Sequence, residues 1–130
     1  MSGPERTFTL GVNKHLVPGL HHEGMANPYR GGTPDHWYSG TRDLWIEYKF
    51  VKLPKRPDTV IDFGLSALQV RWITQRADEG RNVWVIVGCK EGGVAFRGTS
   101  WGRAWSVAEF KERLSTRAEL GQCISDFCCS

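Results

Sequence analysis

The clearest pattern in the chain is an alternation of apolar and polar side chains over residues 43–50. In an extended segment one face would carry apolar side chains, namely Leu44, Ile46, Tyr48 and Phe50. The other face would carry Asp43, Trp45, Glu47 and Lys49. A short segment at residues 35–38, Asp-His-Trp-Tyr, precedes this run, and a Ser-Gly-Thr-Arg sequence at residues 39–42 separates the two. The pattern therefore predicts a β-hairpin with its longer strand at residues 43–50.

A helix is expected after an irregular stretch at residues 51–64. That stretch contains two prolines and three basic side chains, which is typical of a mobile basic loop. From residue 65 onward apolar side chains recur at helical spacing, and Ser66 is a suitable N-cap. Gly80 suits the position just after the helix, where glycine is favoured.

The remaining elements complete an α/β pattern. A continuous β-branched and aromatic run at residues 82–88 predicts a strand covered on both faces, followed by a turn and a short strand at residues 94–96. Ser106 and Glu109 form a capping box that begins a helix over residues 106–120, and residues 122–130 are expected to be a frayed tail. A helix is also expected at residues 9–17, ending before Pro18. The order predicts a mixed α/β fold, a small mixed sheet flanked by helices.

Composition narrows the class of protein. A chain of 130 residues with 40% hydrophobic and 24% charged side chains is expected to form one globular domain, residues 1–130. No apolar run is long enough to span a bilayer, and the first residues do not resemble a secretory signal, so we expect no membrane partner and a cytoplasmic location with reduced thiols. The net charge of +3 permits nucleic-acid binding.

Three ionisable side chains converge if the hairpin forms. Asp35 begins the first strand, and Glu47 and Lys49 share one face of the second. Two carboxylates held close together repel each other unless a cation neutralises them, and Mg²⁺ commonly binds one or two protein carboxylates. Taken alone, Glu47 and Lys49 also fit an ordinary solvated strand face with a cross-strand charge pair.

The flanking residues favour the active-site interpretation. Thr33-Pro34-Asp35, followed by Ile46-Glu47-Tyr48-Lys49, resembles the paired motif of the PD-(D/E)XK nuclease superfamily. The sequences LSALQVRW at residues 65–72 and EGRNV at residues 79–83 resemble its VRR-NUC branch, which includes small standalone, often phage-encoded nucleases similar to Holliday-junction resolvases. The resemblance covers about residues 31–88 and implies a restriction-endonuclease-like core within residues 31–98.

The resemblance implies a role for each motif residue. Asp35, Glu47 and the backbone carbonyl of Tyr48 would hold Mg²⁺ or Mn²⁺, and Lys49 would be the catalytic lysine. Gln69 would support the site by contacting a motif residue or the attacking water.

Two features depart from the family pattern. The fifteen residues at positions 50–64 make a longer link before Leu65 than is usual in the family. Relatives often supply another acid from an N-terminal helix; here Glu5 and Glu23 are the candidates, and neither lies in a convincing helical pattern.

The leading hypothesis is a metal-dependent endonuclease that hydrolyses DNA, with branched DNA such as a Holliday junction as a suitable substrate. It would act as a homodimer without a small-molecule cofactor. Expected DNA contacts are Arg30, Lys52, Lys55, Arg56 and Trp45. One alternative is a catalytically silent nuclease-fold module that binds DNA or inhibits a partner. Another is a zinc-stapled protein using the four histidines and the C-terminal cysteines, although their spacing is poor for zinc.

Overall fold

The computed structural model describes residues 3–25 and 32–130. Arg30, one of the expected DNA contacts, lies outside the described residues. The elements in chain order are α1 (Gly3–Asn13), β1 (His21–Gly24), β2 (His36–Ser39), β3 (Asp43–Phe50), α2 (Ala67–Asp78), β4 (Val83–Cys89), β5 (Gly92–Arg97), a short 3-10 helix (Ser100–Gly102), α3 (Val107–Glu112) and α4 (Arg117–Cys129). None of these helices is long and apolar enough to cross a membrane.

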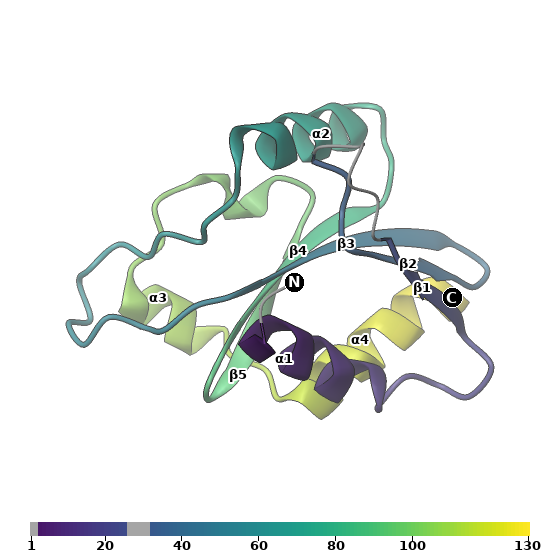
Figure 1. Cartoon of the computed structure of the whole chain (residues 1–130), viewed down its shortest axis with the longest axis horizontal. Coiled ribbons are helices and arrows are strands. Elements are labelled where there is room, and N and C mark those ends of the chain that lie inside the picture. The colour runs from purple at the N-terminus through teal and green to yellow at the C-terminus, as the bar shows by residue number, and fades with distance from the viewer. Residues whose placement is uncertain (1–2, 26–31) are drawn as a thin grey trace.

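The five described strands form one mixed sheet in the order β1-β2-β3-β4-β5 (Figure 1). β3 and β4 are parallel, because the connection between them, which contains α2, returns the chain to the end of the sheet at which β3 begins. The other neighbouring strands are antiparallel. The structure confirms the mixed α/β fold, including the predicted hairpin and its longer strand.

Helices cover both faces of the sheet, so the alternation along each central strand divides the core in two. On one face Ile46 and Tyr48 of β3 pack with α1 and α4 (Figure 1). On the other face Val85 and Val87 of β4 pack with α2 and α3. Each fully buried Val or Ile side chain contributes roughly 1.5–3 kcal/mol relative to an exposed one. β4 is buried at every position, as the continuous apolar run predicted.

The helix predicted after residue 65 is confirmed with its caps. Ser66 is the N-cap of α2, and Gln69 completes a capping box with it. Gly80 follows the helix with φ of +80°, a left-handed conformation that favours glycine.

The C-terminal prediction was right at its start, because Ser106 and Glu109 form the expected capping box, but wrong beyond it. α3 ends at Glu112, and a further capping box between Thr116 and Glu119 begins α4. Between these helices Ser115 exchanges two backbone hydrogen bonds with Gly93 of β5 (3.0 and 2.8 Å), which an uninterrupted helix could not make. Residues 122–130 therefore belong largely to α4 and are not a frayed tail: Cys128 is buried in the core, although all four cysteines are free thiols.

Two other expectations need correction. α1 begins at Gly3 and ends at Asn13, so it starts earlier and ends earlier than the predicted helix at residues 9–17. The second half of the irregular stretch is fixed rather than mobile, because Ile61 and Phe63 are buried and the Ile61 N–H donates to the carbonyl of Trp105 (2.9 Å).

Candidate active site

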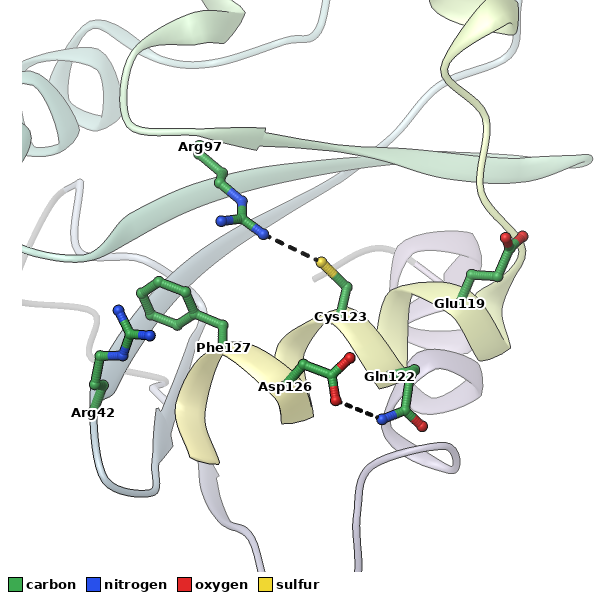
Figure 2. A pocket seen from close by; sticks show the side chains of 7 residues that line it. All are labelled: Arg42, Arg97, Glu119, Gln122, Cys123, Asp126 and Phe127. Atoms are coloured by element: carbon green, nitrogen blue, oxygen red, sulfur yellow. Dashed lines mark hydrogen bonds between the residues drawn. The ribbon is translucent and has the colours of Figure 1, made fainter. Parts of the chain in front are cut away.

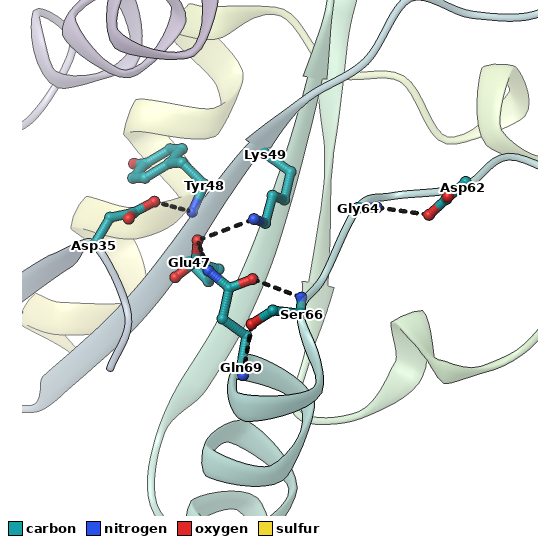
Figure 3. Close-up of polar contacts among 8 residues, drawn as sticks. All are labelled: Asp35, Glu47, Tyr48, Lys49, Asp62, Gly64, Ser66 and Gln69. Carbon is teal, nitrogen blue, oxygen red and sulfur yellow. Dashed lines mark hydrogen bonds and ion pairs between the residues drawn. The ribbon is translucent and has the colours of Figure 1, made fainter. Parts of the chain in front are cut away.

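The site lies where β3 extends beyond its neighbour β2. The pairing of β2 with β3 begins at His36 opposite Ile46, so the second half of β3 pairs only with β4. Along this open edge the Tyr48 N–H donates to Oδ2 of Asp35 (3.0 Å), the residue just before β2. Asp35 therefore supplies the hydrogen bond that a continued β2 would have made, and its carboxylate is held beside β3 (Figure 3).

Three carboxylates from three segments meet at this edge. Oxygens of Glu5 from α1, Asp35 and Glu47 from β3 all lie within 4.8 Å of one another. The expectation that Glu5 lies outside a helix was wrong, since it is in the first turn of α1. Glu23, the other candidate, lies on exposed β1 and pairs with His21 (3.0 Å). Pro4 and Glu5 at a helix start were the available sequence signal.

Glu47 is the buried centre of the cluster and is held from one side. Its side chain is 1% exposed. Lys49 Nζ lies 3.8 Å from its Oε2, and Gln69 Nε2 donates to the same oxygen (3.1 Å). Its other oxygen, Oε1, is buried and accepts no hydrogen bond from the residues that the structure describes.

Gln69 connects the site to the start of α2. The side-chain Oε1 of Gln69 accepts from the backbone N–H of Ser66 (2.9 Å), and the backbone N–H of Gln69 donates to Ser66 Oγ (3.1 Å). The capping box thus fixes the amide so that Nε2 faces Glu47 (Figure 3). One side chain both caps the helix and contacts the cluster.

The electrostatics follow from burial and like charge. Desolvation and the neighbouring Asp35 carboxylate raise the pKa of Glu47 far above its usual range, although Lys49 acts in the opposite direction. Burial also raises the pKa of Asp35 and of Glu5. Without a cation, the cluster therefore retains protons that ordinary carboxyl groups would have lost near neutral pH.

The donor set fits a divalent cation. Carboxylate oxygens are the ligands that Mg²⁺ and Mn²⁺ prefer, and the unsatisfied Oε1 of Glu47 is a buried acceptor in need of a positive partner. A cation would replace the protons that like-charge repulsion now retains on the cluster. The Tyr48 main chain lies beside Asp35, but its carbonyl as a further ligand stays a prediction.

The other expected residues that the structure describes belong to β3 and to the chain that follows it. Lys52, Lys55 and Arg56 are exposed on the chain that follows β3. Trp45 is half-buried on the same face of β3 as Glu47, with its ring 5.8 Å from that of Trp72.

The zinc hypothesis receives no support from the geometry. Within residues 3–25 and 32–130, the carboxylate trio is the one group of three or more His, Cys, Asp or Glu side chains whose donor atoms lie this close together. His22 and His36 instead contact each other, with Nδ1 and Nε2 separated by 3.0 Å.

Comparison with known proteins supports the fold. No family model matches the chain, and no curated protein matches it. Among solved structures it is similar to Hjc from Archaeoglobus fulgidus, a Holliday junction resolvase from an archaeal hyperthermophile. The TM-score is 0.53 and the identity 20%, over 89% of this chain and 98% of that one. This likeness shows a shared fold.

Proposed function

We propose that the protein is a metal-dependent endonuclease that hydrolyses phosphodiester bonds in DNA and prefers branched DNA such as a Holliday junction. The observation that carries this proposal is the meeting of Glu5, Asp35 and Glu47 within 4.8 Å of one another, with Lys49 beside Glu47. The fold shared with a Holliday junction resolvase supports the same conclusion.

The carboxylates would bind Mg²⁺ or Mn²⁺. Glu5, Asp35 and Glu47 supply side-chain oxygens, and Tyr48 is expected to add its backbone carbonyl. When bound, such an ion polarises the phosphoryl group and makes hydroxide available near neutral pH.

Lys49 and Gln69 would neutralise charge on the phosphate and orient the groups of the site. Lys49 places a positive charge 3.8 Å from Oε2 of Glu47. There it would offset the charge that develops on the phosphate and orient the attacking water. Gln69 would be a positioning residue: its hydrogen bond holds Oε2 and leaves Oε1 of Glu47 available as a ligand for the ion.

DNA is expected to contact the surface next to the cluster. Lys52, Lys55 and Arg56 would contact backbone phosphates, as would Arg30, and Trp45 would stack on a base. We expect a homodimer, because two sites related by symmetry could each cleave one strand of a four-way junction. We also expect each chain to be a single domain and the protein to act in the cytoplasm.

A cleavage panel tests the proposal. Purified protein is incubated with linear, nicked, flap and four-way DNA in the presence of Mg²⁺, Mn²⁺ or EDTA. We expect ion-dependent cleavage with four-way DNA cut fastest, and its loss in Lys49→Met. Absence of cleavage on every DNA with both ions, in protein that still binds Mn²⁺ by calorimetry, would contradict the enzyme and favour a silent DNA-binding module.

A further inference from the structure

A pocket with two arginines in its lining lies on the face of the sheet that is covered by α1 and α4. It has a volume of about 480 Å³ and is lined by Arg42, Arg97, Glu119, Gln122, Cys123, Asp126 and Phe127 (Figure 2). Arg42 comes from the turn before β3, Arg97 ends β5, and the other five residues lie on α4. None of these residues belongs to the carboxylate cluster.

Two guanidinium groups are held in this pocket by one aromatic ring. Arg42 lies over Phe127, 4.5 Å from the ring centroid. Arg97 lies 5.7 Å from the same centroid and 4.6 Å from that of Trp84. Stacking of this kind restrains a guanidinium while leaving the N–H groups in its plane available to an anion.

Among the residues that the structure describes, neither arginine has a carboxylate partner. No ion pair joins Arg42 or Arg97 to an acidic side chain within the described ranges. Arg97 donates instead to Sγ of Cys123 (3.6 Å), and Arg42 donates to the hydroxyl of Ser130. Two restrained cations with only weak or neutral partners make a site for an anion with several oxygens, such as a phosphate.

The acidic residues of the pocket are engaged within α4. Asp126 accepts from the Gln122 amide (2.8 Å), and Glu119 accepts from the Thr116 N–H at the start of the helix (2.9 Å). They still lower the positive potential of the pocket, so removing one of these charges should strengthen anion binding.

We propose that Arg42 and Arg97 together bind a backbone phosphate of DNA away from the bond that is cleaved. Arg42 precedes Glu47 by five positions, which is roughly 17 Å along an extended strand. Arg97 stacks on Trp84, which packs with α1 and α4, whereas Glu47 contacts Gln69 of α2 on the opposite face of the sheet. Both arginines are exposed, which suits a polymer more than a small enclosed ligand. The inference rests on the proposed function, because a nuclease supplies the reason for DNA to reach this face.

Binding in EDTA tests the proposal without cleavage. The probe is fluorescent four-way DNA, measured by anisotropy at several salt concentrations, with folding checked by thermal denaturation. We expect Arg42→Gln with Arg97→Gln to weaken binding about tenfold, and the slope of log affinity against log salt to become about 1 smaller in magnitude. Arg42→Lys with Arg97→Lys should fall between, because lysine keeps the charge without the planar fork.

Two further variants set the controls. Arg113→Gln removes another exposed arginine that stacks on an aromatic ring, here 5.2 Å from Trp105, and should leave the affinity unchanged. Asp126→Asn should instead increase the affinity. Unchanged affinity in the Arg42 and Arg97 double glutamine variant, or an equal loss in Arg113→Gln, would overturn the proposal.

Cysteine protection gives a second readout that needs no substitution. Cys123 contacts Arg97 and is half-buried, whereas Cys129 is exposed outside the pocket and serves as an internal control. DNA should slow alkylation of Cys123 by iodoacetamide and leave Cys129 unaffected, as measured by mass spectrometry. Equal protection of Cys123 by inorganic phosphate at the same phosphate concentration would show that the ligand is a free anion and would overturn the assignment to DNA.

The proposal can fail while the nuclease stands, and the reverse also holds. Ion-dependent cleavage by a protein whose DNA affinity ignores both arginines would reject this pocket alone. An inactive protein that binds DNA through Arg42 and Arg97 would reject the nuclease alone, because neither readout in EDTA requires catalysis.

Discussion

The two halves of β3 differ in how their edges are paired. Residues 43–46 all pair with β2, Trp45 and Ile46 pair with β4 as well, and the inward side chains Leu44 and Ile46 are fully buried. From Glu47 onward β3 pairs with β4 alone. The first half has its β2 edge paired throughout and is buried, whereas on that same edge the second half is open and must be satisfied by something other than a strand.

The difference shows how the fold creates the candidate site. Asp35 satisfies the Tyr48 N–H at the open edge, and this contact brings its carboxylate toward Glu47. The same arrangement crowds like charges in a buried place, which raises the pKa of Glu47. Pairing with β2 therefore ends halfway along β3, and the half beyond it holds a cluster of like charges that protons now neutralise and that a cation could neutralise instead.

The largest expected effect comes from neutralising the carboxylates of the open half. Glu47→Gln or Glu5→Gln should lower the rate of DNA cleavage by about a thousandfold or more, because each removes a charged ligand. Glu23→Gln is the matched control, since Glu23 lies outside the cluster on exposed β1, and its rate should equal that of the wild type. Rates are measured in single-turnover cleavage of four-way DNA.

The same variants report on stability with the opposite sign. In EDTA, Glu47→Gln should unfold at a higher temperature than the wild type, because it removes like-charge repulsion while the amide can replace the carboxyl group. Cleavage that survives in both Glu5→Gln and Glu47→Gln would contradict the metal site.

The next largest effect concerns the link between α2 and the open half. Gln69→Glu keeps an oxygen for the Ser66 N–H but places a carboxylate against Glu47, so we expect cleavage to fall about 10- to 100-fold with little change in helix content. Gln75→Glu is the control, because Gln75 is exposed on the same helix. The Mn²⁺ affinity, measured by calorimetry, should fall for the first variant only; equal affinities would show that Gln69 acts solely as a cap.

Much of this comparison was readable from the sequence, because it rests on short-range patterns. The alternation in β3 assigns Ile46 and Glu47 to opposite faces, and Asp35 precedes a strand that is expected to pair there. The position of Glu5 was not readable, since α1 is a short helix whose contact with the cluster depends on packing of Phe8 and Val12 against the sheet. Long-range placement of this kind has no local signal.

The prediction of a single helix over residues 106–120 failed for a different reason. The capping box of Thr116 and Glu119 is visible in the sequence and marks a helix start. The prediction missed it because the helix predicted from Ser106 was continued across these positions to residue 120. The break is fixed by hydrogen bonds between Ser115 and Gly93, which are distant in sequence.

A smaller effect is the pH dependence of the metal-free protein. The folded-state pKa of Glu47 is raised to about 9, so the folded state holds a proton that the unfolded chain has lost, and the free energy of unfolding falls as pH rises. Burial lowers the pKa of His36 to about 4, which gives the opposite slope below the ordinary histidine value. Above about pH 7 histidine is neutral in both states, and the slope comes chiefly from Glu47; burial also raises the pKa of Cys128, which adds a slope of the same sign toward pH 9.

Thermal denaturation in EDTA between about pH 7 and 9 measures this slope, and we expect a loss on the order of 1–3 kcal/mol. Glu47→Gln should flatten the profile, and Mg²⁺ should restore stability most at the upper end. A wild-type profile that rises with pH in this window would show that the carboxylates are not crowded as described.

The smallest effect separates two capping boxes of the same design. Thr116→Ala and Ser66→Ala each remove one side-chain acceptor at a helix start, so each should lower the free energy of unfolding by about 1 kcal/mol in urea denaturation. Only the Ser66 box contains a residue that contacts the cluster, because Gln69 holds Glu47. Ser66→Ala should therefore also weaken Mn²⁺ binding by about two- to threefold, whereas Thr116→Ala, at the start of a helix that supplies no residue to the cluster, should leave it unchanged. Equal Mn²⁺ affinities in the two variants would show that the start of α2 does not position the open half of β3.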